Sequence, residues 1–211
     1  MQRYPVTHYI LGLDLGRDQD RSAIAGMALR PVADGPFDLA NYRQPTRPRL
    51  ELNLLQRLPF RMPFLDVARH VEGLVERLNQ RPDWGPRGPN VYLVLDAAGP
   101  GQVVREIITR RPFPATVVPT VITSALDPGR TESGAHTVPR RLLISNFRLL
   151  LETRVIRIHP GLTFGPVLEN EVAAVRPRGG QSAHDDLVIA ATLTGWQATR
   201  IDPTLKYPGS S

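Results

Sequence analysis

Four aspartates stand where a folded chain can gather them into one site. Asp14 closes an apolar run of strand length, and Asp96 closes a second such run. Asp185 and Asp186 stand at the start of a predicted last helix. A carboxylate at the end of a buried strand is costly unless it reaches water, a donor or a cation. Carboxylates brought together repel one another, raise each other's pKa values and form the usual site for Mg²⁺ or Mn²⁺. The pattern therefore predicts a divalent metal centre.

Each acid alone also has a simpler interpretation. The pattern G-x-D-x-G around Asp14 also begins the phosphate-binding half of actin-like ATPases, and an acid at a strand end is often a turn former. Asp96, followed by AAGPG, fits a strand-to-helix turn. Ser182 and Asp185 have the spacing of a helix cap. Only the four acids together favour the metal centre.

Composition limits the classes of protein. The chain has 211 residues, 41% of them hydrophobic, which is enough for one well-buried core. It has no cysteine, which excludes disulfides, thiolate zinc sites and a cysteine nucleophile, so hard cations are the natural metals. No membrane span or signal peptide is evident, and we expect a cytoplasmic protein.

Arginine supplies nearly all of the positive charge. The net charge is +6, and Lys206 is the only lysine. Guanidinium groups bind phosphate through a planar fork. This balance is compatible with nucleic acid, although arginine enrichment also follows genome composition or thermal adaptation.

The elements that must position the acids follow from hydrophobic periodicity. Three strands, at residues 9–16, 22–29 and 50–54, predict an antiparallel meander, with residues 30–48 as connection. A β-α-β-α-β pattern follows, with helices at 65–78 and 102–110 and strands at 90–95 and 115–123. Pro119 places the last of these strands near a sheet edge.

The C-terminal third is predicted to be mainly helical. A polar loop at residues 124–137 is too long for a tight connection and is either mobile or functional. The remaining elements are helices at 139–152, 164–174 and 184–197 and a strand at 154–159. We therefore predict one α/β domain over residues 1–198 and a polar tail over 199–211.

In four segments the sequence resembles the nuclease domain of the large terminase subunit of tailed bacteriophages. The segments, in the order found in that family, are residues 9–23, 92–107, 138–152 and 180–196. The most specific element is H-D-D-L-V-x-A, which begins at His184, and the strand-Asp-x-x-Gly-x-Gly-helix element at Asp96 is second. That family has a ribonuclease H-like fold and is related to Holliday-junction resolvases. The resemblance implies a mixed central sheet, an antiparallel meander plus parallel strands, flanked by helices.

The resemblance also implies a two-metal site. Asp14, Asp96 and one or both of Asp185 and Asp186 would hold two divalent cations, Mg²⁺ or Mn²⁺, about 3.5–4 Å apart on the scissile phosphate. One ion would activate water and the other would stabilise the leaving 3′ oxygen. Adjacent helical residues point about 100° apart, so the last two acids cannot play equal roles. If Asp185 is occupied in the cap, Asp186 is the better ligand.

Several further residues have two open interpretations. The family frequently shows a lysine where this chain has Arg140 and Arg141, so either arginine is a site cation, a phosphate contact or part of a solvated helix face. His184 would orient water or phosphate, or cap a helix. We expect Glu169 and Glu171 to be surface acids or salt-bridge partners.

The resulting hypothesis is an endonuclease that cleaves double-stranded DNA during viral genome packaging, with little sequence specificity because arginine contacts phosphate. Its expected partners are a terminase ATPase domain, the small terminase subunit and the portal, in the host cytoplasm if the chain is viral. The chain has no G-x-x-x-x-G-K-[ST] loop and cannot pump DNA itself, so it is either an excised domain or a separate nuclease.

Three alternatives remain open. One is a structure-selective nuclease of the resolvase type, and another is a catalytically silent DNA-binding packaging module. The third, half of an actin-like ATPase, is disfavoured because the chain is too short for two lobes and lacks a second phosphate loop.

Overall fold

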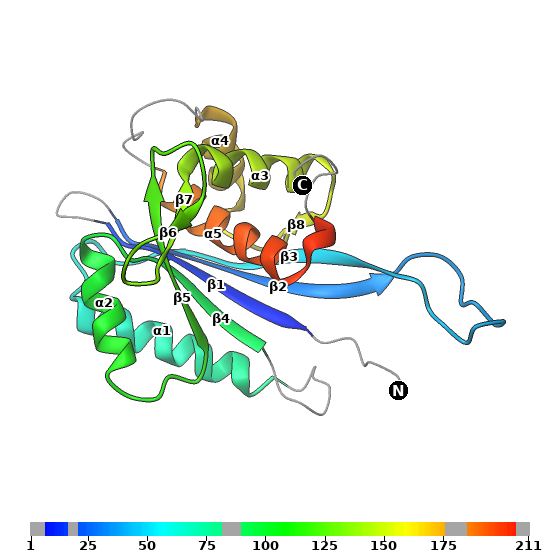
Figure 1. Cartoon of the computed structure of the whole chain (residues 1–211), viewed down its shortest axis with the longest axis horizontal. Coiled ribbons are helices and arrows are strands. Elements are labelled where there is room, and N and C mark those ends of the chain that lie inside the picture. The colour runs from blue at the N-terminus through cyan, green and yellow to red at the C-terminus, as the bar shows by residue number, and fades with distance from the viewer. Residues whose placement is uncertain (1–6, 17–20, 82–89, 176–184, 206–211) are drawn as a thin grey trace.

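The computed structural model describes residues 7–16, 21–81, 90–175 and 185–205, and in this part of the chain an eight-stranded mixed sheet forms the centre (Figure 1). The strand order is β6-β7-β5-β4-β1-β2-β3-β8. The strands are β1 (His8–Asp14), β2 (Ala23–Ala33), β3 (Thr46–Arg57), β4 (Asn90–Asp96), β5 (Thr116–Thr123), β6 (Gly129–Arg130), β7 (His136–Pro139) and β8 (Ile156–Ile158).

Helices cover both faces of this sheet. In Figure 1, α1 and α2 lie on one face, and α3, α4 and α5 lie on the other. The helices are α1 (Phe64–Asn79), α2 (Pro100–Thr109), α3 (Arg140–Glu152), α4 (Gly165–Ala174), α5 (Asp186–Ile201) and the short 3₁₀ helix η1 (Pro203–Leu205). Within the described residues, no helix combines the length and apolarity that crossing a bilayer requires.

The pairing confirms the predicted meander and crossover pattern. β1 pairs antiparallel with β2, and β2 pairs antiparallel with β3, whereas the β1–β4 and β4–β5 pairs are parallel. Along the chain, α1 connects β3 to β4, and α2 connects β4 to β5. The parallel strands are apolar because helices bury them on both faces.

Two predicted boundaries differ from the structure. The predicted loop 124–137 contains β6 and the first half of β7, and β7 pairs with β5, so β5 is not an edge strand. Pro119 is accommodated because the β5–β7 pairing begins only at Thr120. The last helix continues to Ile201 and Leu205 is buried, so the boundary placed at residue 199 falls inside α5.

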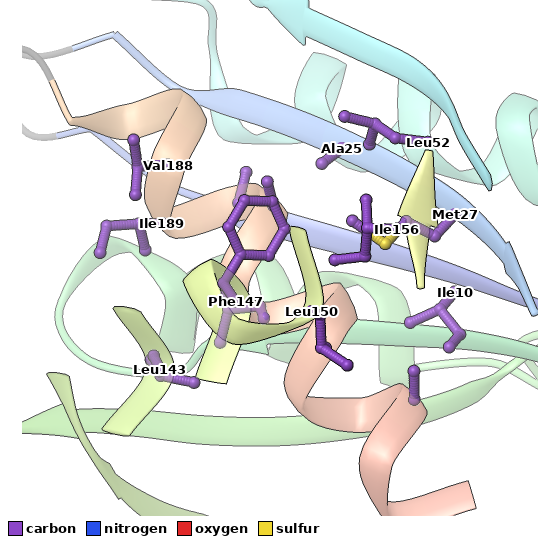
Figure 2. Packing of buried hydrophobic residues seen from close by; sticks show 14 of the residues in the cluster. Ile10, Ala25, Met27, Leu52, Leu143, Phe147, Leu150, Ile156, Val188 and Ile189 are labelled. Atoms are coloured by element: carbon purple, nitrogen blue, oxygen red, sulfur yellow. The ribbon is translucent and has the colours of Figure 1, made fainter. Parts of the chain in front are cut away.

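Two apolar cores lie on the two faces of the sheet. On the α5 face, Phe147 and Leu150 of α3 pack with Val188 and Ile189 of α5 and with Ile156 of β8 (Figure 2). On the other face, side chains of α1 and α2 pack on alternate residues of β1 and β4. α5 is buried almost all round, which explains why it is apolar on every side.

A glycine in β1 lets α5 approach the sheet closely. A Cβ built at Gly12 would lie 2.1 Å from the carbonyl oxygen of Ala190 in α5. That oxygen belongs to the backbone, so the helix itself would have to move. Gly12 therefore fixes the position of α5 above β1.

We expect Gly12→Ala to lower the free energy of unfolding by about 1–3 kcal/mol, the usual cost of overpacking a core. Gly73→Ala is the matched control, because a Cβ there meets only the flexible end of Arg77 at 3.5 Å and a helical alanine adds up to about 1 kcal/mol. Urea unfolding of both variants measures the difference. An unchanged midpoint for Gly12→Ala would show that α5 is not held this closely.

Candidate metal centre

Two of the predicted acids lie side by side at one end of the sheet. Leu13 of β1 pairs with Leu95 of β4, so Asp14 and Asp96 are the next residues on neighbouring parallel strands. Asp14 lies four residues after Ile10, and Asp96 lies two residues after Val94. Ile10 and Val94 belong to the core on the α5 face, so both aspartates are on that face of the sheet. The predicted convergence of these two strand ends is therefore present in the fold.

The same row continues across the meander to an arginine. Asp14 pairs with Ala23 of β2, and Ala23 pairs with Arg57 of β3. Paired residues on neighbouring strands share a face, so Asp14 and Arg57 point toward α5 from backbones roughly 10 Å apart. The small side chain of Ala23 leaves space between them.

α5 brings the remaining two acids to this row. Ala190 lies over Gly12, and Asp186 is one helical turn before Ala190. One turn of helix matches about two residues of strand, so the start of α5 lies above Asp14. Asp185 is the residue immediately before the helix, and its side chain makes no capping hydrogen bond.

Electrostatics shows that the four acids are neighbours. Burial raises the pKa of Asp14 well above its usual value, and Asp96, Asp185 and Asp186, in that order, raise it further. Arg140 opposes this increase. Asp14 thus lies within the field of the other three predicted acids, which are distant in sequence.

Arg140, the first residue of α3, points into the acid cluster. Its Nη2 donates to Oδ2 of Asp185, and both side chains are mostly buried. Its Nε is buried and has no hydrogen-bond acceptor among the described residues. The structure therefore places Arg140 beside the acids, whereas Arg141 donates to the backbone carbonyl of Leu126.

Arg57 binds two acids at once. Its Nε donates to Oδ2 of Asp186 at 2.9 Å, and its Nη2 donates to Oδ1 of Asp186 at 3.1 Å and to Oε1 of Glu171 at 2.6 Å. The guanidinium group also lies over the ring of Phe164, 5.8 Å from its centroid. Burial opposes the charge on Arg57, but Asp186 and Glu171 raise its pKa above the usual value.

Of the two roles expected for Glu171, surface acid or salt-bridge partner, the structure shows the second, an ion pair with Arg57. Burial raises the pKa of Glu171 to about 7, and Asp186 and Asp185 add to this against the opposing effect of Arg57. Its Oε2 is buried and accepts no hydrogen bond from any described residue. Glu171 is therefore a fifth carboxyl group of the cluster.

The turn after Asp96 is held by a hydrogen bond of the Asp96 side chain and by two glycines. Oδ1 of Asp96 accepts from the backbone N–H of Ala98 at 3.0 Å. A Cβ at Gly101 would lie 1.6 Å from the carbonyl oxygen of Asp96, and Gly99 has φ +54°. The strand-to-helix turn is thus fixed by glycines, and Asp96 both supports it and belongs to the acid cluster.

One predicted residue lies outside the described part of the chain. His184, together with Ser182 of the expected cap, belongs to the range 176–184, which is outside the described residues. No sequence pattern indicated Arg57 as a site residue, and Glu171 was expected only as a surface acid or salt-bridge partner. Arg57 lies 129 residues from Asp186 and 114 residues from Glu171 along the chain.

The donor set fits a hard divalent cation. It consists of carboxylate oxygens, and within the part of the chain that the structure describes, Arg57 and Arg140 are the guanidinium groups that pair with these acids. A divalent cation would relieve the repulsion that raises the pKa of Asp14. Among the described residues, however, no three His, Asp or Glu side chains are arranged to hold an ion. Two arginines balance part of the negative charge instead.

Comparison with known proteins identifies the fold. No family model matches the sequence, and no curated protein matches it significantly. The nuclease domain of the human cytomegalovirus terminase, soaked with Mn, is similar over 93% of this chain and 83% of that domain, with TM-score 0.52 and 12% identity.

Two further solved structures match more weakly. The large terminase nuclease domain of bacteriophage SPP1, with bound Mn, gives TM-score 0.49 at 12% identity and covers 90% of this chain and 86% of its own. RuvC of Thermus thermophilus gives 0.33 at 9% identity, over 90% and 96%. The chain has a ribonuclease H-like α/β fold and is similar in structure to a terminase nuclease domain.

Proposed function

We propose that this protein is a divalent-metal-dependent endonuclease that cleaves double-stranded DNA with little sequence specificity. The observation that carries the proposal is the gathering of Asp14, Asp96, Asp185 and Asp186 at one end of a ribonuclease H-like sheet. Nothing in an ordinary core requires so many carboxylates in one place, since each raises the cost of the others.

The acids of this chain would hold the metal, which is Mg²⁺ or Mn²⁺. Asp14 and Asp96 would bind it from the strands, and Asp185 and Asp186 would approach from the start of α5. Two such ions, when bound, supply an activated water and stabilise the leaving oxygen of a phosphodiester. Arg140, beside Asp185, adds positive charge where the DNA phosphate would lie.

The proposed biological role is cleavage of viral DNA during genome packaging. A chain without an ATPase loop would then act with a terminase motor, and with a small terminase subunit and a portal, in the cytoplasm of the host cell. Contacts from arginine to phosphate position DNA without reading its bases, so we expect little dependence on sequence.

Nicking of supercoiled plasmid tests this function. We expect cleavage with millimolar Mn²⁺ or Mg²⁺, none with EDTA, and recovery when excess metal is restored. Cleavage that persists in EDTA would contradict the metal-dependent mechanism. A four-way junction tested beside linear duplex separates the alternatives: preferential cutting of the junction would identify a resolvase, and DNA binding without cleavage would identify a silent packaging module.

A further inference from the structure

We propose that Arg57 and Glu171 are positioning residues for this metal centre. They hold Asp186, the first residue of α5, so that Asp185, the residue immediately before the helix, is the one of these two acids that binds the cation. This inference rests on the proposed function. The sequence favoured Asp186 as the ligand on the assumption that Asp185 caps the helix. In the structure Asp185 makes no capping hydrogen bond, and it is Asp186 that is bound, by Arg57.

Arg57 holds Asp186 at two points. Both carboxylate oxygens of Asp186 accept from Arg57, at 2.9 and 3.1 Å, which is the two-point geometry of an arginine–carboxylate pair. Asp186 itself is buried. Because the ring of Phe164 and the carboxylate of Glu171 also contact the guanidinium group, it is held on several sides.

Glu171 connects a third element to this pair. Glu171 belongs to α4, Arg57 ends β3, and Asp186 begins α5, so one ion cluster joins three elements. The start of α5 therefore has its position fixed by Gly12 from below and by this cluster from the side. A loose helix start would let Asp185 move by more than metal binding tolerates.

Asp185 is held by fewer contacts than Asp186. Asp185 stands immediately before the helix, and its side chain makes no capping hydrogen bond. Only Oδ2 of Asp185 has a described hydrogen-bond donor, which is Arg140, and Arg140 has no other described acceptor. That single pair can exchange for a cation more readily than the clamp on Asp186.

The test compares matched variants of the whole chain. Arg57→Lys keeps the charge but loses the fork, and Glu171→Ala removes the second carboxylate. The controls are Arg49→Lys on the same strand and Glu169→Ala, an exposed position on the same helix. The measurements are Mn²⁺ affinity by calorimetry, kcat and KM for plasmid nicking, and the melting temperature of the metal-free protein.

We expect both variants, while folded at the assay temperature, to lose roughly 10- to 100-fold in Mn²⁺ affinity and in kcat, as is usual for an outer-shell partner. KM for DNA should change less than about 3-fold, since the clamp contacts no phosphate. Glu171→Gln should recover most of the affinity, because its amide oxygen still accepts from Arg57. Both controls should match the wild type.

The pair of aspartates gives the second comparison. Asp185→Asn should cost at least about tenfold more Mn²⁺ affinity than Asp186→Asn. Equal losses, or a larger loss for Asp186→Asn, would overturn the assignment. Wild-type affinity and kcat in both folded Arg57→Lys and Glu171→Ala would overturn the positioning role. Should Arg57→Lys fail to fold, Glu171→Ala and its glutamine variant decide.

Mn²⁺ binding and DNA cleavage by the wild-type protein together separate a wrong function from a wrong positioning role. A wild-type protein that binds Mn²⁺ but cleaves no DNA would reject the nuclease assignment, and the Mn²⁺ affinities of the variants would still decide the positioning role. A wild-type protein that binds no Mn²⁺ would overturn both.

Discussion

Asp14→Asn is expected to abolish nicking of supercoiled plasmid and, at the same time, to stabilise the metal-free protein. The loss of activity should far exceed the roughly 10- to 100-fold that loss of a residue supporting a metal ligand costs, because Asp14 would itself bind the metal and lies within the field of the other three acids. The gain in stability follows because asparagine removes a buried charge that its neighbours repel.

The gain in stability should depend on pH. The pKa of Asp14 is raised by burial and by Asp96, Asp185 and Asp186, so the folded state keeps a proton that the unfolded chain releases near pH 4. The contribution of Asp14 to stability is therefore fully present below about pH 4 and is lost as the pH rises through the higher folded pKa. The advantage of Asp14→Asn should be small at pH 4 and larger at pH 8.

Thermal melting of the two proteins in EDTA across this pH range measures the effect. A protein of this size gains about 2–4 °C for each kcal/mol. Asp66→Asn, an exposed acid in the first turn of α1, is the control and should show no pH-dependent gain. Retained nicking in Asp14→Asn would reject its catalytic role, and a melting temperature below wild type at every pH would reject the repulsion.

The strand acids were predictable from the sequence because their signal is local. An apolar run that stops at a carboxylate identifies both the strand and the end at which its acid lies, and parallel strands bring such ends together. The glycine at position 12 was visible as part of the motif around Asp14. Its physical reason, the close approach of α5 to β1, is tertiary and appears only in the fold.

The position of Arg57 could not be predicted because the register of the β2–β3 pair changes before it. The pairing of β2 with β3 shifts between Gly26 and Met27, which pair with Leu54 and Leu52. Leu54 consequently packs in the core on the α1 face, although alternation from Leu50 and Leu52 would place it on the α5 face. A one-residue shift moves every later side chain to the other face, so no sequence pattern could locate Arg57 beside Asp14.

Glu171 and the β6–β7 hairpin were missed for a related reason. The sequence allowed Glu171 to be a surface acid or a salt-bridge partner, and only its contact with Arg57 from a distant strand makes it part of the site. β6 and β7 are short and polar, so periodicity gives no signal for them. Features set by long-range pairing rather than by local pattern are the ones that required the structure.

Millimolar Mn²⁺ or Mg²⁺ is expected to raise the melting temperature of the wild-type protein substantially. A ligand that binds only the folded state adds about 2.7 kcal/mol when its free concentration is 100 times Kd, and this corresponds to roughly 5–10 °C for a chain of this size. The increase should be larger at pH 8 than at pH 5, because at the lower pH the cation must displace the proton that the raised pKa of Asp14 retains.

The matched variants separate this effect from a general effect of salt. NaCl at equal ionic strength should shift the melting temperature little, and Asp14→Asn and Asp96→Asn should lose most of the response to metal. Glu169→Ala, exposed on α4, should keep it. An unchanged melting curve, or the same increase in Asp14→Asn as in the wild type, would mean that the cation binds elsewhere. The carboxylates at the end of the sheet would then be a cluster that Arg57 and Arg140, among the described residues, balance without a cation.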